Sequence, residues 1–120
     1  MTNQPIDESV LEGLQLLQRK GRPDLAKTTV MLFLESAPKA LKDLQTGVVQ
    51  NDAELVRQAS HVLQSSSAAV GAVRLSARCK QLERMARSGS VLDVARHVQA
   101  ILRLYGAADS ALRAWYASRA

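Results

Sequence analysis

Three things are scarce in this sequence: aromatic side chains, cysteine and long apolar runs. Trp, Tyr and Phe make up 3% of the 120 residues, so the apolar content comes mostly from Leu, Val and Ala, which favours helix-on-helix packing over a β-sandwich. The single cysteine, Cys79, excludes an intrachain disulfide and favours a reducing compartment. The longest apolar run covers residues 30–34, which is far too short to cross a bilayer.

The first ten residues, MTNQPIDESV, also lack the basic segment and apolar stretch of a secretory signal. We therefore expect a cytoplasmic protein without membrane contact. Hydrophobic residues make up 47% of the chain, which fits one compact core. We expect a flexible segment over residues 1–6 and a single helical domain over residues 7–120. The net charge of +5 leaves nucleic acid, a membrane surface or an acidic protein as partner classes.

Helical periodicity recurs along the chain and is broken by short polar segments. Asp7 is a good N-cap for a first helix that turns its apolar residues inward. Pro38 is expected to break or kink the second helix. Asn51, with Glu54 three residues later, resembles a capping box at the start of the helix that carries residues 59–72. The inward residues of the first helix are predicted to be Val10, Leu14 and Leu17.

Apolar stripes indicate how the later helices pack. One stripe ends near Gly71 and the next ends near Gly89, and a last helix opens at Ser90 and Asp93. No segment shows the alternation of a strand. The chain is therefore predicted to be all-α, an antiparallel four-helix bundle with additional short N-terminal helices. The stripes comprise Leu55, Val56, Ala59, Val62, Leu63, Ser66 and Val70; Ala72, Leu75, Cys79, Leu82 and Ala86; and Val94, Ala95, Val98, Ile101, Leu102, Tyr105, Leu112 and Trp115.

In the sequence, His61 stands among the residues of the first stripe, but its side chain is not expected to point the same way as theirs. Side chains advance by about 100° per residue along a helix, which places His61 nearly opposite the apolar residues around it. We therefore expect its imidazole to face solvent. The neighbours predicted on the same face are Arg57, Gln64, Ser65 and Ala68, and three of these are short or uncharged. A partner could approach the ring closely.

Other roles for the histidines and serines are less well supported by the sequence. No carboxylate stands three or four residues from His61, so neither a zinc site nor a catalytic triad is predicted, and we expect no bound metal. His97 is interpreted as a structural or surface residue. Ser66 is expected on the packing stripe, with its hydroxyl bonded to a carbonyl one turn back.

The spacing from His61 to Arg87 resembles the histidine-containing phosphotransfer (HPt) domains of bacterial multistep phosphorelays. Their pattern is a histidine, two serines, Gly-Ala, a leucine, a cysteine and then Leu-Glu-x-x-Ala-Arg. The matching residues here are His61, Leu63, Ser66, Ser67, Gly71, Ala72, Leu75, Cys79, Leu82, Glu83, Ala86 and Arg87.

The resemblance implies that His61 accepts a phosphoryl group from an aspartate of a receiver domain and passes it to another receiver. It implies response-regulator receiver domains and a hybrid sensor histidine kinase as partners. It also implies a monomeric phosphocarrier rather than an enzyme, with no cofactor of its own and with Mg²⁺ on the partner receiver. Partner docking is expected at Ala68, Lys80 and Arg87.

Two positions depart from the family pattern. The family usually has lysine and glycine three and four residues after the histidine, and this chain has Gln64 and Ser65. Arg57, one turn before His61, or Arg84, on the following antiparallel helix, is our hypothesis for the source of the missing charge. The departures also motivate an alternative, a degenerate HPt-like bundle that docks or inhibits partners without phosphotransfer.

Nucleic-acid binding is the remaining alternative that the basic charge raises. Aromatic residues are few, and no basic cluster coincides with a helix-turn-helix signature. We therefore expect no nucleic-acid partner.

Overall fold

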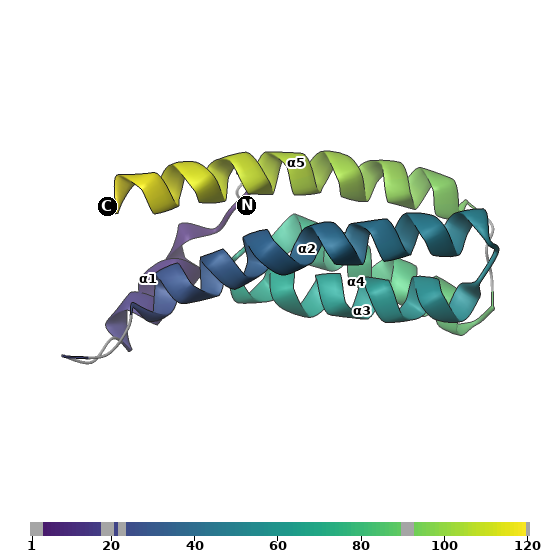
Figure 1. The fold of residues 1–120 in the computed structure, drawn as a ribbon, viewed down its shortest axis with the longest axis horizontal. Helices are drawn as coiled ribbons and strands as arrows, with labels where there is room; N and C mark the ends of the chain where they lie inside the picture. The colour runs from purple at the N-terminus through teal and green to yellow at the C-terminus, as the bar shows by residue number, and fades with distance from the viewer. Residues whose placement is uncertain (1–3, 18–20, 22–23, 90–92, 120) are drawn as a thin grey trace.

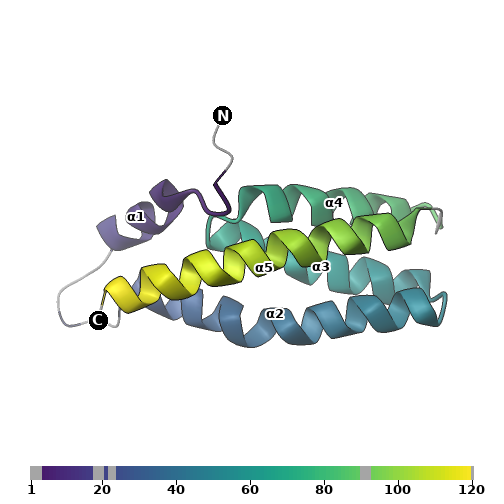
Figure 2. The same cartoon turned by 90° about the horizontal axis from the view of Figure 1, so that it is seen from above.

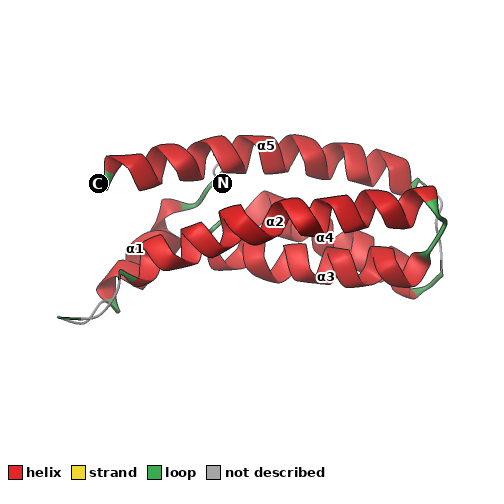
Figure 3. Cartoon of the chain, viewed as in Figure 1, coloured by secondary structure: helices red, strands yellow, loops and turns green. Residues whose placement is uncertain are grey.

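The computed structural model describes residues 4–17, 21, 24–89 and 93–119, and this part of the chain forms helices without a strand. The helices are α1 (Glu8–Leu16), α2 (Leu25–Val49), α3 (Ala53–Ala69), α4 (Val73–Arg87) and α5 (Val94–Ser118). Helices α2 to α5 run side by side along the long axis, and α1 lies at one end of them (Figures 1 and 2). Figure 3 shows the same helical content by colour. The predicted all-α four-helix bundle is confirmed, with one described N-terminal helix added to it.

Helix α2 continues through Pro38, so of the predicted break or kink the break is wrong. Proline removes one backbone donor and crowds the carbonyl four residues earlier. Pro38 is exposed, which lets water satisfy the freed carbonyl. Phe33 and Ala37 before it and Leu41 after it are buried on one continuous face. Packing of this face against the bundle outweighs the local preference for a break.

The turn between α2 and α3 is capped by Asp52 rather than Asn51, which corrects the sequence prediction. The Asp52 carboxylate accepts a hydrogen bond from the backbone N–H of Leu55 at 3.1 Å. Asn51 lies one residue earlier, with a φ of 55°, and asparagine tolerates this left-handed conformation better than most residues. The predicted N-cap of α1 is confirmed, because Asp7 accepts from the N–H of Ser9 at 3.0 Å.

The inward residues predicted for the first helix are only partly right: Val10 and Leu14 are partly buried, and Leu14 packs against the core. Leu11 is fully buried, whereas Leu17 is 68% exposed, because α1 rests on the end of the bundle and contacts it along one narrow side. The N–H of Asp7 donates to the carbonyl of Gly71 at 2.8 Å, which ties α1 to the turn between α3 and α4. Ile6 is buried in the core, although we placed it in a flexible segment; residues 1–3 of that segment lie outside the described residues.

The stripe predicted for α4 is confirmed, because its five residues are all buried in the core. The stripe of α3 is only partly right. Val56, Ala59, Leu63 and Val70 are buried, but Val62 is 49% exposed. Ser66, four residues after Val62 on the same predicted stripe, is only partly buried. Its hydroxyl donates to the carbonyl of Val62 at 3.0 Å, as predicted.

The inward face of α3 is shifted because the helix lies between two neighbours. It packs against both α2 and α4, so the buried face extends to Ser60 and Ser67, which have no exposed surface. Small side chains at these positions let the helices approach closely. The last helix carries five of its predicted inward residues in the core, while Leu102 and Tyr105 are partly buried and Ala95 is exposed. Ser90 lies outside the described residues.

Within the described ranges, no helix combines the length and apolar character that crossing a bilayer would require.

Candidate functional site

His61 lies in the middle of α3 and faces outward, as the helical angle predicts. Its side chain is 59% exposed. The core beneath it is formed by the buried residues of α3 described above, so the backbone that carries the ring is held by packing on its other side. The imidazole is therefore an accessible group on a rigid helix.

The ring is oriented by a carboxylate that the sequence prediction missed. His61 Nδ1 lies 2.8 Å from Glu83 Oε1 and 3.4 Å from Glu83 Oε2. We expected no carboxylate in position to orient this ring, and that expectation is wrong. It considered residues three or four positions away on the same helix, whereas α3 and α4 form an antiparallel pair that brings a residue 22 positions later alongside. The signal that could have found this contact is the antiparallel pairing itself, in which residues 80–84 of the second helix come level with His61.

Glu83 is largely buried, and its carboxylate has polar partners on two sides. Its side chain is 10% exposed, and Arg87 Nη2 lies 3.4 Å from the same oxygen that meets His61. A buried carboxylate needs such partners because the loss of hydration is costly. An ionised carboxylate can only accept hydrogen bonds, so Nδ1 carries the proton and donates it to Glu83. The lone pair of the neutral ring is then on Nε2.

Arg57 is held by a neighbouring acid on its own helix. Arg57 Nη2 lies 2.6 Å from Glu54 Oε1, and Arg57 Nε lies 3.0 Å from Glu54 Oε2. Hydrogen bonds from Arg57, and then from Gln58, lower the pKa of Glu54 to about 2. This bidentate pair occupies the guanidinium that our hypothesis offered as a replacement for the missing lysine.

The side chains that follow His61 on its face of α3 are uncharged and mostly small. Ser65 and Ala68 are exposed, and Gln64 is partly buried; their spacing from His61 places them on its side of the helix. Ser76 Oγ donates to the carbonyl of Gln64 at 3.0 Å, which joins α3 to α4 beside the site. Their small or neutral side chains leave room for another protein to reach the ring.

Three cations predicted for the site lie on α4. Lys80, Arg84 and Arg87 are all exposed. In the part of the chain that the structure describes, Lys80 and Arg84 have no side-chain hydrogen bond or ion pair, whereas Arg87 meets Glu83. The structure therefore brings Glu83 and Arg87 together with His61 and leaves Lys80 and Arg84 as exposed charges on the same helix.

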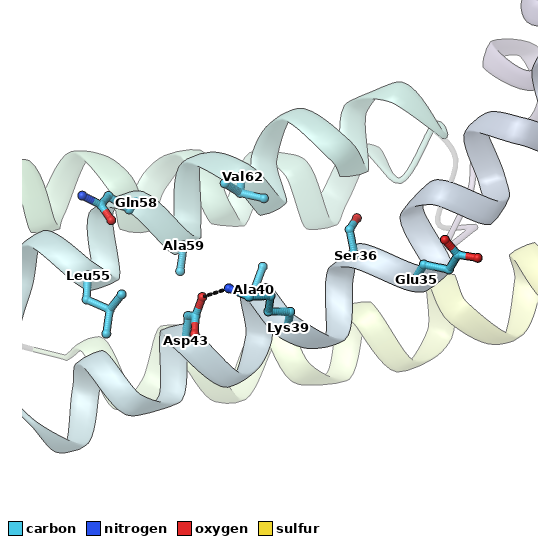
Figure 4. A pocket seen from close by; sticks show the side chains of 9 residues that line it. All are labelled: Glu35, Ser36, Lys39, Ala40, Asp43, Leu55, Gln58, Ala59 and Val62. Carbon is cyan, nitrogen blue, oxygen red and sulfur yellow. Dashed lines mark hydrogen bonds and ion pairs between the residues drawn. The ribbon is translucent and has the colours of Figure 1, made fainter.

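A groove with a volume of about 300 Å³ lies between α2 and α3 (Figure 4). Val62, the residue after His61, lines it from α3. From α2 the ion pair of Lys39 and Asp43, with Nζ and Oδ2 3.2 Å apart, contributes to its wall. His61, one residue earlier, does not line the groove, and its ring faces Glu83 on α4 instead. The other lining residues of the groove are Glu35, Ser36, Ala40, Leu55, Gln58 and Ala59.

His97 and Cys79 are not available for the same chemistry. His97 is 8% exposed, and its Nδ1 lies 3.3 Å from Arg78 Nη1. Burial, Arg78 and Arg96 lower the pKa of His97. Cys79 is fully buried, and burial raises its pKa to about 12. Among the described residues, no three His, Cys, Asp or Glu side chains gather as metal ligands.

Comparison with known proteins agrees with this geometry. The family model described as "Hpt domain" matches residues 29–113, which include His61 and Glu83. The phosphorelay protein LuxU of Vibrio cholerae is 29% identical over 91 residues, covering 76% of this chain and 80% of that protein.

Two solved structures share the fold. Histidine-containing phosphotransfer protein B (HptB) of Pseudomonas aeruginosa superposes with a TM-score of 0.87 at 22% identity, over 98% of each chain. The HPT domain of a sensor hybrid histidine kinase from Shewanella gives a TM-score of 0.80 at 20% identity, over 95% of each chain. At these identities the likeness establishes the arrangement of the helices.

Proposed function

The chain belongs to the Hpt domain family, and from this membership we propose that it is a phosphorelay phosphocarrier in which His61 holds the phosphoryl group. His61 receives that group from an aspartyl phosphate on a receiver domain and passes it to the aspartate of another receiver. The observation that carries the proposal is the exposed ring whose Nδ1 is held by a buried carboxylate at 2.8 Å. That contact leaves Nε2 as the nucleophile.

The transfer can be written with its atoms balanced. The Nε2 lone pair attacks phosphorus, an N–P bond forms, and the bond from phosphorus to the aspartate oxygen breaks. The aspartate leaves with the electron pair as a carboxylate. The Nδ1 proton stays on the ring, and Glu83 balances the positive charge that the ring acquires. Onward transfer reverses these steps, with an aspartate oxygen of the next receiver as nucleophile.

Such a transfer depends on in-line geometry and charge neutralisation more than on a local acid or base. We propose that this chain supplies the positioned nucleophile and that the receiver supplies Mg²⁺ together with its aspartate. The chain is then a phosphotransfer intermediate rather than a self-sufficient catalyst, and it holds no cofactor. We further propose that it works as a cytoplasmic monomer and that a hybrid sensor histidine kinase feeds the relay.

The docked receiver would cover the small, uncharged side chains around His61. It would also extend to the groove between α2 and α3. Ser65 and Ala68 are exposed on α3, and Val62 is 49% exposed where the groove begins. Val62 would then contribute apolar surface to the contact with the receiver.

A second candidate function is docking or inhibition without transfer. It is favoured by Gln64 and Ser65, which bring no charge to the position where the family usually has lysine. Binding of receivers without uptake of the phosphoryl group would support this candidate.

Transfer from a panel of receiver domains phosphorylated with radiolabelled acetyl phosphate tests the proposal. We expect label to move to the wild-type chain and not to His61→Gln. The matched control is His97→Gln, which removes the other histidine and should still accept label. Receivers that bind the chain but never label it would overturn the proposal in favour of the second candidate.

A further inference from the structure

The seam between α4 and α5 gathers arginine side chains that the proposed function does not use. The two helices pack against each other and run antiparallel (Figure 2). Arg78 of α4 faces α5, and its Nη1 lies 3.3 Å from Nδ1 of the buried His97. Arg74 stands one turn before Arg78, and helical spacing turns it only about 40° from that direction. Helix α4 therefore places two guanidinium groups along the seam.

Helix α5 contributes two more arginines. Arg96 and Arg103 stand four residues before and three residues after Ala100, so the three side chains share one side of the helix. Ala100 is only 4% exposed. Tyr105, about 140° away around α5, contacts Phe33 of α2, with ring centroids 6.0 Å apart. The helix that covers Ala100 is therefore α4, and the two arginines border the seam.

The four arginines along the seam, which we call the α4–α5 arginine patch, have almost no acidic counterpart. Within the described residues, three of the four have no ion pair with a carboxylate. For the fourth, Arg96 Nη2 lies 3.8 Å from Asp93 Oδ1, and the arginine side chain is 79% exposed, so this pair contributes little. Burial lowers the pKa of His97, and Arg78 and Arg96 lower it further. The patch comprises Arg74, Arg78, Arg96 and Arg103.

The chemistry and size of the patch fit a short acidic peptide segment. Guanidinium groups bind carboxylates in a fixed and often bidentate geometry. Arg74 and Arg78 stand about 6 Å apart along α4. Arg96 and Arg103 stand about 10 Å apart along α5. A few neighbouring Asp or Glu side chains span such distances.

Other anionic partners need features that the patch lacks. The aromatic side chains of the described residues are buried or partly buried, so none is exposed there to stack on single-stranded bases. Among the described residues of α4 and α5, Val73 is the one exposed large apolar side chain, and it points about 100° away from Arg74. The patch therefore has no apolar anchor for a membrane surface.

We propose that the α4–α5 arginine patch binds a short acidic segment, a run of Asp and Glu residues, of a partner protein. Arg78 is turned about 140° from Glu83 around α4, so the patch lies away from the side of this helix that contacts His61. The bound segment therefore leaves His61 accessible, and it holds a partner on the chain without entering phosphoryl transfer. This role goes beyond the proposed function and does not depend on it.

Binding of a fluorescent peptide of about eight glutamates tests the patch by anisotropy at about 50 mM salt, where screening is weak. Arg74→Gln/Arg103→Gln is compared with Lys42→Gln/Lys80→Gln, which removes the same net charge from exposed positions outside the patch. We expect the dissociation constant to rise about 5- to 10-fold in the patch variant and less than about twofold in the control. Equal losses in the two variants, or no binding to the wild-type chain, would overturn the proposal.

The two histidines of the chain report where the peptide binds. The ring signals of His97 in NMR spectra should shift when the peptide is added, because this ring contacts Arg78. The ring signals of His61 should stay unchanged. Shifts at His61 without shifts at His97 would place the peptide elsewhere and contradict the proposal.

A short DNA duplex and vesicles of phosphatidylglycerol test the other anionic partners with the same two double variants. We expect the patch substitutions to weaken peptide binding more than they weaken binding of either competitor. A larger loss with DNA would assign the patch to nucleic acid, and a larger loss with vesicles would assign it to a membrane surface. Either result would overturn the proposal.

Discussion

The imidazole of His61 and the carboxylate of Glu83 form the smallest unit on which the proposed function depends. His61 supplies the nitrogen that reacts, and Glu83, held by the core of α4 and by Arg87, fixes which nitrogen that is. The outward direction of His61 could be predicted from the helical angle alone. The contact with Glu83 is not visible in the pattern within one helix, and only the antiparallel register of α3 and α4, which brings residues 80–84 level with His61, could have indicated it.

Replacing Glu83 should therefore slow transfer without removing the nucleophile. We expect Glu83→Ala to lower the transfer rate about 10- to 100-fold, because the ring loses its fixed orientation. Glu83→Gln should lose less, since an amide oxygen can still accept from Nδ1. The measurement is the rate of receiver-dependent labelling, together with nitrogen NMR of the ring, in which the share of the Nδ1–H tautomer should fall.

The control for Glu83 is Glu12→Gln, which removes an exposed carboxylate from α1. It should leave both the rate and the tautomer unchanged. A Glu83→Ala variant that transfers at the wild-type rate would show that the contact has no part in positioning the ring.

At the scale of helices, the sequence predicted the fold class and most inward faces, but it placed several local features wrongly, of which three are instructive. Pro38 did not end α2, because the buried residues on both sides of it share one face. The residue type of Asn51 predicts a cap, whereas in the structure Asn51 precedes the cap by one residue and adopts a left-handed conformation. Leu17 was assigned inward by periodicity, which cannot show that α1 contacts the bundle on one narrow side only. Local rules do not include these tertiary contacts.

The cap of α3 can be tested directly by comparing the two adjacent residues. We expect Asp52→Ala to lower the free energy of unfolding by about 1 kcal/mol, because the N–H of Leu55 loses its acceptor. Asn51→Gly should cause no loss, because glycine adopts the positive φ of this position freely. Urea denaturation of both variants measures the difference. A larger loss for Asn51→Gly than for Asp52→Ala would contradict the assignment of Asp52 as the cap.

Gly71 joins α1 to the turn between the two helices of the site. Its φ is +80°, and a Cβ built on it would collide with the carbonyl oxygen of Asp7. We expect Gly71→Ala to lower the free energy of unfolding by about 1–3 kcal/mol, from backbone strain and displacement of α1. The matched substitution is Gly106→Ala in α5, where a Cβ meets nothing within 4 Å; this variant should gain about 0.5–1 kcal/mol. Equal stability of the two variants in urea would contradict the close packing at Gly71.

At the scale of the whole molecule, stability should depend on pH through His97. Burial, Arg78 and Arg96 lower the pKa of this residue below its ordinary value of 6.5. The unfolded chain therefore takes up a proton on His97 at a higher pH than the folded chain does. The free energy of unfolding should fall as the pH drops from about 7 through the folded pKa of His97.

Urea denaturation between pH 7.5 and 5 measures this fall in the wild-type chain and in His97→Gln. The difference between them isolates His97 from the carboxylates, and the fall should be smaller in the variant. Arg78→Gln should also reduce it, because one of the repelling guanidinium groups is removed. Identical pH profiles for the wild-type chain and His97→Gln would contradict this interpretation.

The four packed helices support one exposed histidine on the outer face of α3. The net charge of +5 was visible in the sequence, but its meaning was not, because a sum does not show which charges are paired. The structure shows that Arg57 and Arg87 are engaged by carboxylates. Lys80 and Arg84 of α4 are exposed and have no such partner among the described residues, which no count of residues could have identified.

The central claim is that the phosphoryl group resides on Nε2 of His61 while Glu83 holds Nδ1. Phosphorus–nitrogen correlation NMR on the chain, labelled with ¹⁵N-histidine and phosphorylated by a receiver domain, measures this most directly. We predict a single phosphohistidine, bonded through Nε2 and absent from the His61→Gln variant. A phosphoryl group on Nδ1 of His61, on His97 or on a serine would contradict the account.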